Sequence, residues 1–366
     1  MQGPEFAVAV SLFCAAWPVA AQPASPDEPA HTSWVRVATA NFELYTTSGE
    51  AAGRGLIDRL ERLRPVLQSV LPGKGAPQRP VCIIAFRSHD EFQPYAPISR
   101  ATGFYLPGAR RDFIVLDTPS PETRTAAHEY GHLVIAQSGL RLPPWLNEGL
   151  AELYSNVAAA PPDPRIVVGQ FIPSRVLTLR RSNWIGLTEL VSAGVNAPAF
   201  TSPGMVDSAY AESWLLAHML VLDPAYAARF PSFLLALQTS DTPEAFGTVY
   251  GKSTAQVERD MSASLEKGQA NARVTQSSLP VTPPSIDVEL DADFGARLAL
   301  AEMLRDYRGR EEQARQIYQA LRRDYPLRPE LETGIPEIYR SEGNQALAAE
   351  HRERAAVPGA MVPSSH

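Results

Sequence analysis

The sequence predicts an α+β domain followed by a short helical region. Three observations lead to this fold class. Short strand-like runs occur between residues 34 and 116, amphipathic helical patterns follow from about residue 120, and a weak 34-residue repeat marks the end of the chain. The chain has 366 residues, of which 45% are apolar and 20% charged. This is enough for a large core, and the length favours two domains.

Composition shifts divide the chain into successive segments. We predict a signal peptide at 1–21, a linker at 22–33, a main domain at 34–270, a second linker at 271–290, a helical region at 291–358 and a disordered tail at 359–366. Gln22 to His31 is rich in Pro and Ala, and Asn271 to Asp287 is rich in Pro, Ser and Thr.

The leader predicts export. Phe6 to Ala21 is an almost continuous apolar run that ends in small residues, although no Lys or Arg precedes it. The run is too short to span a bilayer comfortably, because a spanning helix needs about 20 residues. We therefore expect a periplasmic or extracellular protein with no transmembrane segment in the mature chain.

Charge and residue usage narrow the classes of function. The net charge is −7 and no basic patch stands out, so nucleic-acid binding is not expected. Lys occurs only at positions 74, 252 and 267, and such a preference for Arg is typical of GC-rich bacteria. Cys82 lies in an apolar run, where we expect an inert, buried strand residue.

The first part of the main domain combines strands with one helix. Trp34 to Thr46 has the pattern of two short strands around Asn41. Residues 50–71 carry apolar side chains at helical spacing and predict a helix. The apolar runs Val81 to Phe86 and Phe113 to Leu116 predict two buried strands.

One run carries the chemistry, the H-E-x-x-H pattern of His128-Glu129-Tyr130-Gly131-His132. We expect a helix here that begins near Ser120, a good cap, and ends at Gly139. Positions four apart lie on one helix face, so His128 and His132 can aim at one point. Two imidazoles suit Zn2+, and Glu129 could take the proton of a water bound to that ion.

A second segment, Trp145 to Glu152, supplies the rest of the site. A catalytic zinc needs a third protein ligand, and Glu148 is the natural choice, with fifteen residues between it and His132. Pro143-Pro144 would make the intervening turn rigid before a second helix. On that helix Glu152 lies one turn after Glu148. It either receives the N–H of a ligand histidine or belongs to a solvated face.

With both segments identified, the chain resembles the gluzincin metallopeptidases of the peptidase MA-like kind. In these proteins H-E-x-x-H lies on one helix, and the glutamate of a W-L-x-E-G-x-A segment on the next helix completes the zinc site. The resemblance extends more loosely from about Trp34 to about Leu265. It implies a zincin-like domain with a mixed sheet, the H-E-x-x-H helix and a helical subdomain, and a peptide or protein substrate.

Two further expectations follow from the resemblance. Its members have a tyrosine early in the helix after the glutamate helix, and Tyr210 occupies a similar place in the predicted helix 207–222. The Tyr210 hydroxyl could donate to the carbonyl oxygen of the substrate, or it could be a core tyrosine. The substrate backbone would pair as an added strand along Phe104 to Leu116, unless that segment is a plain edge hairpin. His218, on the Tyr210 helix, is expected to be a core or surface residue.

The end of the chain has a repeat pattern. Gly309 recurs as Gly343, a period of 34 residues. Four residues also match the second half of a tetratricopeptide unit: Ala314, Tyr318, Leu321 and Pro326. Two units are few for a free solenoid. Region 291–358 is therefore expected to pack on the main domain, to assemble with another chain, or to bind a protein partner, and a plain helical hairpin is the alternative.

The sequence thus predicts an exported zinc metallopeptidase. His128, His132 and Glu148 would bind zinc, Glu129 would act as general base, Tyr210 would steady the oxyanion and Glu152 would support a ligand histidine. Two alternatives belong to other classes. One is a non-catalytic protein-binding module that uses the helical end of the chain, and the other is a zinc hydrolase of a non-peptide amide in the cell envelope.

Overall fold

A seven-stranded sheet forms the centre of the computed structural model, which describes residues 9–11, 33–70, 81–119, 124–159, 165–181, 184–267, 273–276 and 285–331. The strand order is β1-β5-β6-β4-β3-β2-β10. The strands are β1 (Ala9–Ser11), β5 (Gly103–Leu106), β6 (Asp112–Leu116), β4 (Val81–Ala85), β3 (Phe42–Thr46), β2 (Val35–Ala38) and β10 (Asp287–Glu289). With its helices, the fold is α+β, as the sequence predicts.

The sheet is mixed. β4 pairs in parallel with both β3 and β6, whereas the remaining pairs are antiparallel. The two strands predicted around Asn41 are the antiparallel pair β2 and β3. Every residue of β4 is buried, as its continuous apolar run predicts for a strand covered on both faces. Burial raises the pKa of the Cys82 thiol on this strand to about 12, so Cys82 is a poor nucleophile.

One face of the sheet packs on α1 (Glu50–Val70), which matches the helix predicted at 50–71. The apolar residues of α1 are joined in one core with those of β2, β3 and β4, including Leu60, Leu44 and Ile83, none of which is exposed to solvent. This core continues into the helices that carry the candidate site.

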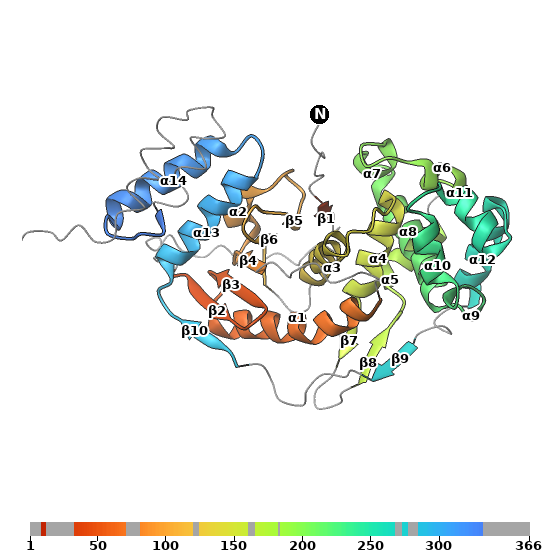
Figure 1. Cartoon of the computed structure of the whole chain (residues 1–366), viewed down its shortest axis with the longest axis horizontal. Coiled ribbons are helices and arrows are strands. Elements are labelled where there is room, and N and C mark those ends of the chain that lie inside the picture. Colours follow the sequence, from red (N-terminus) through yellow and green to blue (C-terminus); the bar gives the residue numbers. More distant parts are fainter. Residues whose placement is uncertain are drawn as a thin grey trace, which may run out of the picture.

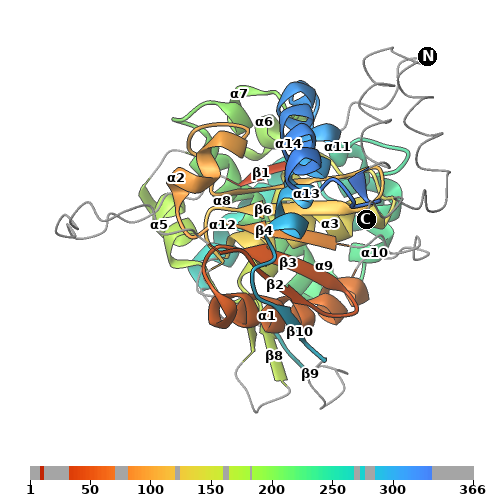
Figure 2. The same cartoon turned by 90° about the vertical axis from the view of Figure 1, so that its left-hand side faces the viewer.

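The other face of the sheet packs on α13 (Asp293–Asp306), and α14 (Glu311–Asp324) packs on α13. Figure 2 shows both helices in front of the sheet. A second core joins Ala296 and Met303 to Phe104 and Phe113 of the sheet. Of the three arrangements expected for region 291–358, residues 293–331 therefore adopt the first, packing on the main domain. Residues 332–358 lie outside the described chain.

The chain between β6 and β10 is mainly helical, and its helices after α3 lie on the opposite side of α3 from α13 and α14 (Figure 1). Its helices are α3 (Thr125–Gln137), α4 (Pro144–Ser155), α5 (Pro173–Arg181), α6 (Leu187–Ser192), α7 (Pro198–Thr201), α8 (Val206–Leu222), α9 (Pro224–Ala227), α10 (Phe230–Ala236), α11 (Thr242–Ala245) and α12 (Thr254–Lys267). A small sheet combines β7 (Ala158–Ala159), β8 (Arg165–Val168) and β9 (Arg273–Gln276).

Strands occur in two segments that were predicted to lie outside the folded domains. Residues 9–11 of the predicted signal peptide form β1, which pairs antiparallel with β5 and contacts α3. The predicted linker 271–290 contributes β9 and β10, which pair with β8 and β2. The predicted linker at 22–33, apart from its last residue, and the predicted disordered tail at 359–366 lie outside the described residues. Among the described helices, none is long and apolar enough to cross a membrane.

Candidate metal centre

The H-E-x-x-H segment lies on α3, and every residue from Thr125 to Ile135 is buried. The helix ends one residue before Ser138, and Gly139 follows with a positive φ of 72°, as expected for a glycine that terminates a helix. The described helix begins at Thr125, and the expected cap, Ser120, lies outside the described residues.

The helix α4 carries Glu148 and begins at Pro144, directly after Pro143 in an extended conformation. α3 and α4 pack very closely at Gly131, where a Cβ atom would lie 3.1 Å from Cα of Ala151. A larger residue at position 131 would force the helices apart. The glycine of the H-E-x-x-H segment therefore allows α3 and α4 to approach closely.

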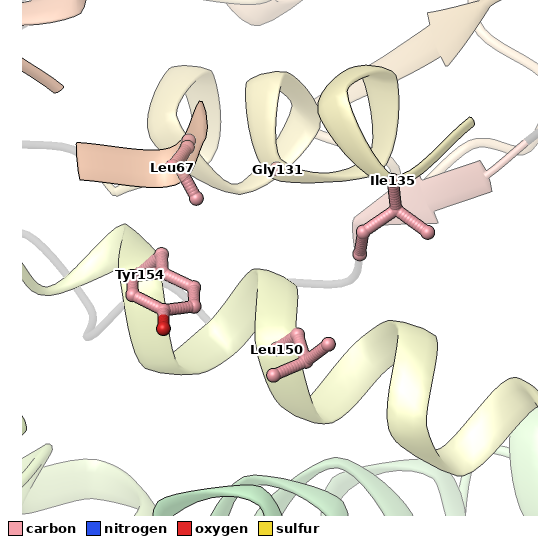
Figure 3. A pocket seen from close by; sticks show the side chains of 5 residues that line it. All are labelled: Leu67, Gly131, Ile135, Leu150 and Tyr154. Carbon is pink, nitrogen blue, oxygen red and sulfur yellow. The ribbon is translucent and has the colours of Figure 1, made fainter. Parts of the chain in front are cut away.

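A small apolar cavity lies between these helices and α1 (Figure 3). Its walls are Leu67, Gly131, Ile135, Leu150 and Tyr154. The lining has no charged side chain, so this cavity belongs to the helix packing and offers nothing to hold an ion.

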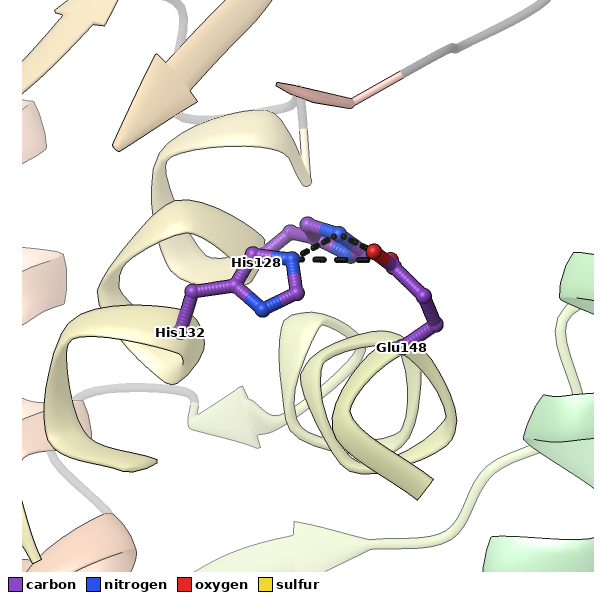
Figure 4. Close-up of side chains that lie close together, drawn as sticks. All are labelled: His128, His132 and Glu148. Carbon is purple, nitrogen blue, oxygen red and sulfur yellow. Dashed lines mark hydrogen bonds and ion pairs between the residues drawn. The ribbon is translucent and has the colours of Figure 1, made fainter. Parts of the chain in front are cut away.

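Three candidate ligands meet across α3 and α4 (Figure 4). The Nε2 atoms of His128 and His132 lie 3.0 Å apart. Oε2 of Glu148 lies 3.3 Å from Nε2 of His128 and 3.5 Å from Nε2 of His132. In the described part of the chain, this is the one group of His, Cys, Asp or Glu residues that could hold a metal ion.

The outward nitrogen of each imidazole faces an oxygen acceptor. Nδ1 of His132 lies 3.0 Å from Oδ1 of Asn147, and Nδ1 of His128 lies 3.5 Å from Oε1 of Glu152. An amide oxygen and a carboxylate can only accept a hydrogen bond, so both acceptors favour a proton on Nδ1. Each Nε2 atom then keeps a lone pair that points into the site.

This arrangement fits a cation. Two imidazole lone pairs and a carboxylate oxygen repel one another when nothing positive lies between them, and a metal ion removes that repulsion. Burial alone would lower the pKa of His132, but the nearby charge of Glu148 and its hydrogen bond raise it to about 9. The site therefore attracts positive charge, as a proton or as a metal ion.

Glu129 is fully buried beside these ligands. Burial has the largest effect on the pKa of both His132 and Tyr210, and the negative charges of Glu148 and Glu129 both act to raise it. Glu129 and the two histidines are thus buried, and Glu148 is partly exposed.

Tyr210, on α8, also lies at the centre. Its ring stacks on that of His128 with centroids 6.2 Å apart, and its hydroxyl hydrogen-bonds the side chain of Glu148. Burial and the negative charges of Glu148 and Glu129 raise the pKa of the phenol well above its usual value. Tyr210 is therefore both a buried tyrosine with a bonded hydroxyl and a proton donor next to the ligands.

Glu152 is held as an anion. It is fully buried, and burial alone would raise its pKa, but the charge and hydrogen bonds of Arg175 lower the pKa to about 2. Arg124 also donates to this carboxylate, at 3.2 Å. Of the two roles considered for Glu152, the structure places it behind His128 and away from a solvated helix face.

Three residues of the centre were not predicted from the sequence: Asn147, Arg124 and Arg175. Asn147 lies within the Trp145 to Glu152 segment, directly before Glu148. That position could have identified it as a residue of the site. Arg175 comes from a Pro- and Gly-rich stretch without strong periodicity, so no local pattern marks it.

Two other side chains, on α8 and α4, belong to the core. His218 is fully buried, and its Nε2 donates to the carbonyl oxygen of Gly169 at 2.9 Å, so it is a core histidine. Trp145 is also fully buried and donates to Thr242. Neither side chain is among the candidate metal ligands.

The chain matches no protein-family model, and no curated protein is detectably similar to it in sequence.

Proposed function

We propose that this chain is an exported, zinc-dependent peptidase of the gluzincin type. The observation that carries the proposal is the convergence of the buried His128 and His132 with the partly buried Glu148, while Glu129 is buried on the same helix as the histidines. A purely structural metal site needs no further carboxylate of this kind, whereas hydrolysis needs a base.

The ligand distances support zinc as the metal. Zinc binds nitrogen and oxygen ligands at about 2.0–2.2 Å in a tetrahedral site, so neighbouring ligand atoms lie about 3.3 Å apart. The three separations between Nε2 of His128, Nε2 of His132 and Oε2 of Glu148 are 3.0, 3.3 and 3.5 Å. One point can therefore lie about 2 Å from all three atoms, as a bound zinc ion would require.

The chemistry divides between the ion and the chain. When bound, zinc would polarise the scissile carbonyl and lower the pKa of a coordinated water. The Glu129 carboxylate takes a proton from the attacking water and later gives it to the nitrogen of the leaving amine. Glu129 then returns to its starting state, one peptide bond is broken, and one water is consumed.

Tyr210 would act on the oxygen of the scissile carbonyl. Hydrolysis builds negative charge on the carbonyl oxygen, and a phenol at the site can donate a hydrogen bond to it. The raised pKa of Tyr210 keeps its proton in place at neutral pH. We therefore assign Tyr210 to stabilise the oxyanion.

Strand β5 supports an extended peptide as the substrate. β5 contacts α3, and its outer edge pairs antiparallel with the three residues of β1. If β1 leaves with the predicted signal peptide, this edge becomes free beside the site. Backbone pairing along it would place a substrate strand beside α3, the helix that carries Glu129. In this proposal the mixed sheet, α3 and α4 form a zincin-like domain.

The first alternative, a binding module at the helical end of the chain, has weaker support. The inner residues of α13 and α14, such as Ala299, Leu300 and Tyr318, are already buried against the sheet or each other. Region 291–358 remains a candidate surface for a protein partner. The second alternative, hydrolysis of a non-peptide amide, uses the same residues and is decided by the choice of substrate.

The proposal is tested with residues 22–366 loaded with zinc and offered a peptide library and cell-envelope amides. Glu129→Gln should keep the metal and lose about 10²–10⁴-fold in peptide cleavage, because the base is gone. Glu189→Gln is the matched control, since this exposed carboxylate on α6 lies outside the site. Cleavage of envelope amides alone would favour the second alternative, and undiminished cleavage by Glu129→Gln would exclude Glu129 as the base.

A further inference from the structure

One arginine outside both metal helices contacts two elements of the candidate centre. Arg175, on α5, is only 6% exposed. Its Nη2 donates to Oε1 of Glu152 at 2.8 Å, and its Nε donates to Oε2 at 3.2 Å. This is a bidentate contact between a planar guanidinium and a planar carboxylate, and it fixes the orientation of both groups.

The same guanidinium lies over the ring of Tyr210, with its central carbon 5.4 Å from the ring centroid. A third contact joins Nη1 of Arg175 to Asp207, at 3.8 Å, on the first turn of the Tyr210 helix. One side chain therefore ties α5 to Glu152 on α4 and to Tyr210 on α8.

We propose that Arg175 is a positioning residue that holds Glu152 against His128 and holds the Tyr210 ring over the site. The expected effect of Arg175 on kcat rests on the proposed function. The expected effect on metal binding depends only on the ligand cluster, so the two can be tested apart.

Arg175 contacts the oxygen of Glu152 that faces His128, so its role differs from that of a cation that only balances the carboxylate charge. Oε1 of Glu152, the oxygen that Arg175 binds at 2.8 Å, is also the oxygen that lies 3.5 Å from Nδ1 of His128. Arg124 donates to the other oxygen, Oε2, at 3.2 Å. Loss of Arg175 would leave Arg124 as a cation next to Glu152. The carboxylate would keep a positive partner but lose the contacts that fix Oε1 toward His128.

Tyr210 would lose its support at the same time. The flat guanidinium over the ring attracts the π face and limits ring movement. Phe200 touches the ring too, with centroids 6.5 Å apart, but Phe200 carries no charge. Arg175 thus contacts both Glu152, which lies behind a candidate ligand, and Tyr210, the proposed oxyanion donor.

The test compares Arg175→Ala with Arg180→Ala, which removes an exposed arginine from the same helix. Arg175→Ala should weaken zinc affinity and lower kcat, each by about 10–100-fold, with KM little changed, because residues that orient metal ligands have effects of this size. Millimolar guanidinium should restore part of both quantities in Arg175→Ala and have no such effect on the wild type or Arg180→Ala. Arg175→Lys keeps the charge without the fork and should stay well below the wild type.

Three results would overturn the inference. The first is wild-type zinc affinity and kcat in Arg175→Ala. The second is a loss in Arg175→Ala that guanidinium does not rescue, since that points to a purely structural ion pair. If Arg175→Ala fails to fold, wild-type zinc affinity in Arg175→Lys is the third. If the wild type cleaves no substrate, the proposed function fails, while weakened and rescuable zinc affinity would still support positioning by Arg175.

Discussion

Oε1 of Glu152 lies 3.5 Å from Nδ1 of His128, while Nε2 of the same ring faces Glu148 at 3.3 Å. The imidazole is therefore held between two carboxylates from one helix, four residues apart. Glu148 lies on the side of the candidate metal site, and Glu152 lies on the opposite side of the ring. Such a carboxylate fixes the ring orientation and makes the metal-facing nitrogen more basic.

Asn147 should do the same for His132. Its Oδ1 lies 3.0 Å from Nδ1 of His132 and keeps the proton on that nitrogen. Replacing Asn147 with Ala should weaken zinc affinity by about tenfold, because the ring loses the acceptor that fixes its tautomer and direction. Competition with a chromogenic chelator measures the change, and Asn196→Ala, at an exposed position, is the control. Equal affinities in both variants would mean that Asn147 does not orient the ligand.

Tyr210→Phe separates the proposed oxyanion role from a packing role. The ring and its contacts with His128 and Arg175 would remain, and only the hydroxyl would go. We expect kcat to fall by about 10²–10³-fold, with zinc content kept and KM little changed. Tyr226→Phe is the control, because that hydroxyl donates to Asp260. A wild-type kcat in Tyr210→Phe would leave Tyr210 as a core residue only.

The buried His218 should make folding stability depend on pH. Burial lowers the pKa of His218, so the folded state favours the neutral ring that donates to Gly169. An unfolded chain takes up this proton near pH 6.5, and the folded chain does so only at lower pH. The unfolding free energy should therefore fall as the pH drops below about 6.5, by at most about 1.4 kcal/mol per pH unit from this residue.

His218→Gln isolates this effect, because Gln can keep a donor near Gly169 and does not titrate. Urea unfolding at pH 8, 6 and 5, with a chelator present, gives the difference between wild type and variant. We expect the wild type to lose more stability toward pH 5 than His218→Gln does. Parallel curves would show that His218 does not contribute to the acid sensitivity.

The local parts of the centre could be predicted from the sequence. The spacing of His128 and His132 places both on one helix face, and one short turn brings Glu148 back to them. These relations depend on neighbours in the chain. The structure adds the close packing at Gly131, which brings α3 and α4 together.

The parts that depend on distant partners could not be predicted. Arg175 reaches Glu152 from 23 residues away, out of a stretch with no clear pattern. β9 and β10 are strands because β8 and β2 offer edges to pair with, and composition alone favoured a linker there. The weak repeat in region 291–358 left several arrangements open, and contact with the sheet selected one for α13 and α14.

The central claim is that His128, His132 and Glu148 hold one zinc ion. Elemental analysis of residues 22–366 after zinc reconstitution and dialysis tests it most directly, beside His128→Ala, Glu148→Ala and the exposed-site control Glu189→Ala. The account predicts about one zinc per chain in the wild type and the control, and a clear loss in both ligand variants. No zinc in the reconstituted wild type, or full zinc in Glu148→Ala, would contradict it.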